Sequence, residues 1–175
     1  MKTLESIQKT CKVFKTLAKI AMILSFVWAG IVLAGLLCGI AWRTGGSVMG
    51  ISMENVLKMT QAAGLDQMIG ALLADFVFAL TDGLLFFVTH RYLKQELADG
   101  TPFTTQGANQ VKSLGIKTIV MPLVAVIISA VIYECFNLTR PGDWGNDTAV
   151  VLGVALILFS LILRYGAELR ESSRQ

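Results

Sequence analysis

The sequence has few charged residues, a single histidine and no metal-binding cysteine pattern. Charged residues make up 15% of its 175 residues, and the mean hydropathy is +0.65. Soluble domains carry roughly 25% charged residues, and a soluble fold of this length cannot bury so much apolar surface. We therefore predict a membrane protein with one membrane domain, 1–175, and no second folded domain.

The shortage of metal ligands and nucleophiles excludes several kinds of site. His90 is the one histidine, and the three cysteines show no Cys-x-x-Cys spacing, which argues against a zinc site and a Cys–His nucleophile. We expect no cofactor. Cys38 and Cys135 both fall near outer helix ends, so a disulfide stays open beside the reading of two buried apolar side chains. The net charge of +3 comes from short basic clusters, so no direct nucleic-acid binding is expected.

Four long apolar runs dominate what remains. They predict an all-α, polytopic fold with transmembrane helices at about 17–41, 69–88, 116–136 and 148–167. The fourth run is short, so Arg164 is expected to extend its head group toward the membrane surface while the helix continues. Twelve lysines and arginines flank the spans on one side and three on the other, which predicts that both termini are cytoplasmic.

Short helical patterns occur outside the spans. Residues 4–19 place apolar side chains at helical spacing with lysines between them, which fits either an amphipathic helix on the inner leaflet or a straight extension of the first span. In the first outer loop a short amphipathic helix is expected over 53–63. In the inner loop we expect a helix over 91–97, a break at 100–102 and a second short helix that Gly115 links to the third span.

Two segments carry a resemblance to a known family. The first is Leu97-Ala98-Asp99-Gly100-Thr101-Pro102-Phe103-Thr104, followed by Val111-Lys112-Ser113-Leu114-Gly115. The second is Leu163-Arg164-Tyr165-Gly166-Ala167-Glu168-Leu169. With the four-span layout, they resemble the YoaS-like family, small bacterial four-helix membrane proteins classed as a domain of unknown function. The resemblance implies an inner-membrane protein without established enzymatic activity, and a small cytoplasmic helix-turn-helix regulator as partner.

Two aspartates interrupt the second span. Asp75 and Asp82 are seven residues apart and therefore share one helix face. Two mid-helix aspartates oppose insertion by about 5 to 7 kcal/mol, which is close to what the apolar residues of this span supply. The functional interpretation is a proton or cation site, or an anchor for a basic residue of a partner. The structural interpretation is carboxyl groups that bond to Thr81, Ser129 or Ser160. No nucleophile or metal ligand accompanies them, so we predict no enzyme.

The first span carries small residues at four-residue spacing, Gly30 with Ala34 and Gly35 with Gly39. Such pairs permit close helix approach, either within the chain or in a homodimer.

Three functions stay open from the sequence. The favoured one is a non-enzymatic regulator or sensor that acts through a protein partner. The alternative is a small oligomeric transporter, or an ion- or proton-conducting protein, that uses Asp75 and Asp82. A weaker alternative is immunity against a membrane-active peptide.

Overall fold

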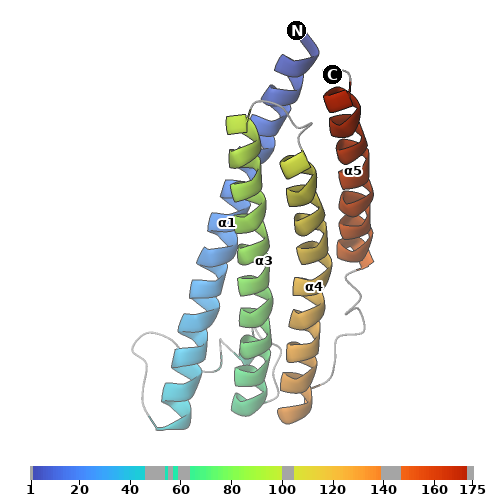
Figure 1. Ribbon diagram of the computed structural model, residues 1–175. Helices are drawn as coiled ribbons and strands as arrows, with labels where there is room; N and C mark the ends of the chain where they lie inside the picture. Colours follow the sequence, from blue (N-terminus) through green and yellow to red (C-terminus); the bar gives the residue numbers. More distant parts are fainter. Residues whose placement is uncertain are drawn as a thin grey trace.

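The described part of the chain forms four long α-helices that run alongside one another (Figure 1). The computed structural model describes residues 2–45, 54, 57–58, 64–99, 105–138 and 147–172. The helices are α1 (Lys2–Arg43), α3 (Leu65–Asp99), α4 (Thr105–Cys135) and α5 (Asp147–Ser172). Each contains a segment long and apolar enough to cross a membrane: Lys9–Arg43, Leu65–Gln95, Gln106–Cys135 and Ala149–Leu169. The predicted all-helical fold with four membrane-spanning helices agrees with this structure.

Helix α1 is continuous over 42 residues. It includes both the predicted span and the basic segment before it, which agrees with the straight extension that the sequence left open. A separate helix lying on the membrane surface is not shown. The helix ends where Gly45 adopts a positive φ of 81° and its amide donates to the carbonyl of Trp42 over 3.1 Å.

Helices α3 and α4 extend beyond the predicted spans toward the same end of the molecule (Figure 1). The expected helical segment over 91–97 is the last part of α3. The expected short helix before the third span is continuous with that span, and Gly115 lies inside α4, so the prediction that Gly115 is a link between two helices is wrong. Gly100, Pro102, Phe103 and Thr104 lie outside the described residues, as does most of the helix expected over 53–63.

Helix α5 is shifted along its own axis relative to α4. Gly153, near the start of α5, packs against Gly115 and Ile119 in the middle of α4. The helix therefore begins about halfway along α4 and continues past the ends of α3 and α4 on the side where both chain termini lie (Figure 1).

The four helices form an open row rather than a closed bundle. Helix α1 packs on α3, α3 on α4 and α4 on α5, and no other pair of helices packs together in the described part of the chain. One buried cluster lies between α1 and α3, formed by Val32, Leu36, Met68, Ile69 and Leu72. A second lies at the α4–α5 contact. Both broad sides of the row stay covered with exposed apolar side chains, as expected of helices in lipid.

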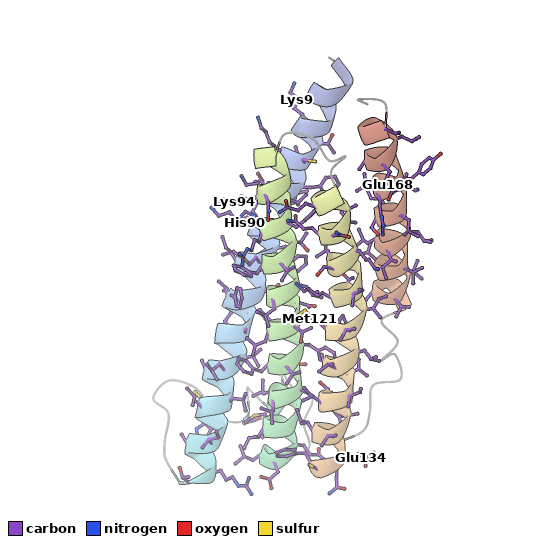
Figure 2. All side chains as sticks on the ribbon, in the orientation of Figure 1. Lys9, His90, Lys94, Met121, Glu134 and Glu168 are labelled. Atoms are coloured by element: carbon purple, nitrogen blue, oxygen red, sulfur yellow. The ribbon has the colours of Figure 1, made fainter. Side chains whose placement is uncertain are left out.

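Antiparallel packing brings the basic helix ends together. The start of α1, the end of α3, the start of α4 and the end of α5 share one end of the row. Figure 2 places Lys9, His90, Lys94 and Glu168 toward this end and Glu134 at the opposite one. We call it the basic end.

Candidate functional site

The two intramembrane aspartates lie on α3, which has a neighbour on each side. Leu72 packs toward α1 and Gly83 lies under Phe26 of α1, whereas Gly70 on the other side meets Phe136 after α4. At 100° per residue, Asp75 and Asp82 fall about a quarter turn from both contact lines. Both carboxylates therefore point out of one broad side of the row, and both side chains are exposed. We call this side of α3 the carboxylate face.

The carboxylate face lies deep in the span. The apolar segment of α3 runs from Leu65 to Gln95, so Asp82 lies about 3 Å and Asp75 about 8 Å from its midpoint at 1.5 Å per residue. A hydrocarbon core about 30 Å thick extends about 15 Å on each side of that midpoint. In a membrane, both carboxyl groups are consequently far from water unless another molecule or a water-filled space covers this face.

The hydroxyl groups expected to satisfy the aspartates bond elsewhere. Thr81 Oγ1 donates to the Val77 carbonyl over 2.8 Å, and Ser160 Oγ donates to the Ile157 carbonyl over 2.6 Å. Ser129 Oγ is fully buried and has no hydrogen-bond partner in the described part of the chain. The interpretation that these three groups tie down the carboxyls is therefore not what the structure shows.

One polar group does lie near the aspartates. The Tyr133 phenol on α4 is close enough to Asp75 for the two groups to interact electrostatically. Asp82 has no hydrogen-bond or ion-pair partner among the described residues. Gly70 meets Phe136, and Tyr92 and Leu114 line one cavity between the two helices, which sets an antiparallel register. That register places Ser129 at a depth between the two aspartates.

None of the described lysines and arginines lies at this depth. In the sequence, no lysine or arginine falls within 20–42, 65–90, 118–135 and 148–163, which include the middle of each of the four helices. The ion pairs among described residues also lie away from the two aspartates, and one of them, Glu54 with Lys58, falls between α1 and α3 in the sequence. Arg43 meets Asp66 at 3.2 Å, and on α5 Arg164 Nε meets Glu168 Oε1 at 3.0 Å. Within the described residues, no group of three or more histidine, cysteine or acidic side chains could hold a metal ion.

The other residues singled out in the sequence lie apart from the aspartates. Gly35 and Gly39 face Leu72, Met68 and Ile69 of α3, whereas Gly30 meets nothing and Ala34 is exposed on α1. On α5, Tyr165 and Leu169 are exposed and Gly166 is half-buried beside the Arg164–Glu168 pair. Cys38 and Cys135 are both free cysteines, so the disulfide that the sequence left open is not formed in the structure.

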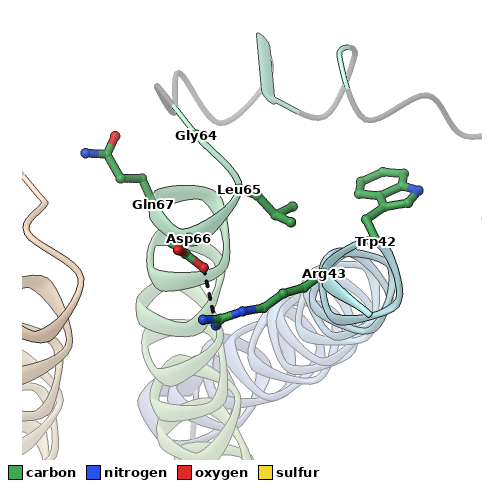
Figure 3. Close-up of a pocket in the computed structure, with 6 residues that line it drawn as sticks. All are labelled: Trp42, Arg43, Gly64, Leu65, Asp66 and Gln67. Atoms are coloured by element: carbon green, nitrogen blue, oxygen red, sulfur yellow. Dashed lines mark ion pairs between the residues drawn. The ribbon is translucent and has the colours of Figure 1, made fainter. Parts of the chain in front are cut away.

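Two hollows that sequence reasoning missed flank α3 at its ends. At the far end, Trp42 and Arg43 of α1 meet Gly64, Leu65, Asp66 and Gln67 around a shallow pocket (Figure 3). At the basic end, a smaller cavity lies between α3 and α4. Each joins residues more than twenty positions apart, so only the helix register reveals it.

Comparison of the chain with family models, with curated proteins and with solved structures finds no match. The resemblance to the YoaS-like family rests on the two sequence segments and the four-span layout.

Proposed function

We propose that this protein is a non-enzymatic, multi-pass membrane component that acts by binding a partner protein inside the bilayer. The supporting observation is the carboxylate face, on which Asp75 and Asp82 are exposed in the middle of α3 and no described lysine or arginine gives them a counter-charge. Carboxyl groups at this depth are strongly unfavourable against lipid alone, and pairing with a basic group relieves this cost.

The charge distribution favours a different protein over a second copy. A symmetric dimer through this face sets carboxylates against carboxylates, and the described residues of a second copy place no lysine or arginine at the same depth. The partner we propose is a transmembrane helix that carries a lysine or arginine near mid-membrane.

The basic end supports an orientation. Because lysines and arginines concentrate on the cytoplasmic side of membrane proteins, both termini are proposed to be cytoplasmic. The family resemblance adds a bacterial inner membrane and a regulatory role, in which the partner or a cytoplasmic regulator relays the signal.

The test uses two adjacent phenylalanines as a matched pair. Phe86 follows Asp82 by four residues and shares its side of α3, whereas Phe87 points about 140° away from Asp82. Both are exposed. A photo-crosslinking phenylalanine analogue at position 86 should capture a membrane protein with a basic residue in a span, and the analogue at 87 should not.

The crosslink must also depend on charge. Asp82→Asn, alone and with Asp75→Asn, should remove it, whereas Asp66→Asn at the end of the same helix should leave it intact. A charge swap should restore the crosslink. In it, Asp82→Lys is combined with an acidic residue in place of the partner's basic residue. Equal crosslinking from both positions, or indifference to Asp82→Asn, would refute the proposal.

A second candidate is proton conduction by an oligomer. It is favoured by four polar groups that lie at neighbouring depths in the membrane: Asp75 and Asp82 on α3, and Ser129 and Tyr133 on α4. Vesicles that contain only the purified protein should then show proton flux, and Asp82→Asn should abolish it. Such flux without any partner would replace the first proposal, and its absence would remove the second.

A further inference from the structure

The cavity at the basic end lies on the other side of α3 from the aspartates. It occupies about 160 Å³ between the end of α3 and the start of α4. Arg91 is nine residues from Asp82, which places it on the opposite side of the helix. Whatever binds in this cavity is therefore independent of the carboxylate face.

The polar lining of the cavity suits a phosphate group. Arg91 and Lys117 supply positive charge, and Gln95, Gln110 and Ser113 supply neutral hydrogen-bond donors, whereas no carboxylate of the described side chains lines the cavity. No ion pair engages Arg91 or Lys117 among the described residues. An arginine fork and a lysine ammonium are the usual protein ligands of phosphate oxygens.

The depth of the cavity distinguishes a lipid from a soluble anion. Arg91 lies about 16 Å from the midpoint of the α3 span, which is the boundary between hydrocarbon and head groups. Two turns deeper, Leu84 lies below Arg91 and Val124 below Lys117, and both are exposed. A lipid whose phosphate lies between the two cations would therefore have its acyl chain against an apolar surface.

We propose that this cavity and the apolar surface below it form one groove, which binds an anionic phospholipid. The phosphate head group lies in the cavity, and the acyl chain lies along Leu84 and Val124. Basic pockets between transmembrane helices are a known means of holding such head groups.

The experiment compares two variants of equal charge. Arg91→Gln with Lys117→Gln removes the cations of the groove, while Lys94→Gln with Lys112→Gln removes two exposed cations from the same ends of the same helices outside it. The full chain is reconstituted in nanodiscs of phosphatidylcholine with a small fraction of phosphatidylglycerol. Native mass spectrometry after mild delipidation then measures the retained anionic lipid. Circular dichroism checks that both variants remain helical.

The groove variant should lose at least tenfold in phosphatidylglycerol affinity, because it removes both charged donors that the cavity offers to the head-group phosphate. The control variant should change it less than threefold. Inorganic phosphate at millimolar concentration should not compete. Equal losses in both variants would indicate diffuse attraction and overturn the proposal, and so would full displacement by inorganic phosphate, which would indicate a soluble anion.

Discussion

The α4–α5 contact and the α1–α3 contact differ in what separates the two backbones. In the first, Gly115 and Gly153 face each other so closely that a Cβ added to Gly115 would lie 2.8 Å from the Gly153 carbonyl oxygen. In the second, the nearest atom to a Cβ on Gly39 is the terminal methyl of Met68, at 3.0 Å. The first contact is backbone on backbone, whereas flexible side chains fill the second.

This difference shows how each edge of the row is held. Apolar burial does not drive helices together in lipid, so association depends on close packing and on polar contacts. Helix α5 approaches α4 most closely at two glycines. Helix α1 gains it from side chains, and it also has a polar contact near each end. Arg43 pairs with Asp66 at 3.2 Å, and His90 Nδ1 lies 3.2 Å from the Lys15 carbonyl oxygen.

Gly153→Ala should have the largest effect of the substitutions considered. The new Cβ would overlap Ile119 and lie 2.9 Å from the Gly115 carbonyl, which cannot move without shifting α4. Overpacking of this kind costs about 2 to 3 kcal/mol. Unfolding of the detergent-solubilised protein, followed by circular dichroism, measures the loss. A change below about 0.5 kcal/mol would contradict the backbone contact.

Gly115→Ala tests the same contact from the other helix. Its Cβ would lie 2.9 Å from Ile157 Cγ1 and 3.1 Å from the Ile157 amide nitrogen, so we expect a loss of about 1 to 3 kcal/mol. Because either alanine forces the same helices apart, the double variant with Gly153→Ala should lose clearly less than the sum of the single losses. Strict additivity in this double-mutant cycle would mean that the two glycines do not share one contact.

The role of Gly115 shows where sequence reasoning succeeds and fails. The four spans were predictable because each apolar run is long enough to cross a bilayer. A glycine at the edge of a run, however, signals either a break or a close approach. The prediction chose the break, and the partner glycine that decides the matter lies 38 residues further along, at Gly153.

The candidate sites show the same limit. The seven-residue spacing correctly placed Asp75 and Asp82 on one side of α3. It could not show that this side is open, because the order of helices in the row cannot be inferred from spans that are apolar all round. Arg91 and Lys117 were recognised only as flanking charges. Their common groove exists because α3 and α4 pack in one particular register.

Gly39→Ala should be milder than either change at the α4–α5 contact. The methyl of Met68 and Cγ1 of Ile69, at 3.0 and 3.1 Å, belong to side chains that need to move by only a few tenths of an ångström. Alanine also favours a helix over glycine by roughly 0.5 to 1 kcal/mol, which offsets part of the strain. The net change should stay within about 1 kcal/mol in the same unfolding measurement. Gly30→Ala, which meets no atom, is the control and should not destabilise.

Arg43→Gln should have the smallest effect, because the pair that it breaks is well exposed. The side chains of Arg43 and Asp66 are 60% and 64% exposed, and exposed ion pairs contribute about 0 to 1 kcal/mol. A double-mutant cycle with Asp66→Asn should give a coupling of no more than about 0.5 kcal/mol, and it should shrink further as salt is raised. A coupling above about 2 kcal/mol would mean that the polar contact, and not the packing of Met68 and Leu72, holds α1 to α3. The contrast between the two edges of the row would then rest on electrostatics, and α1 rather than α5 would be the helix sensitive to ionic strength.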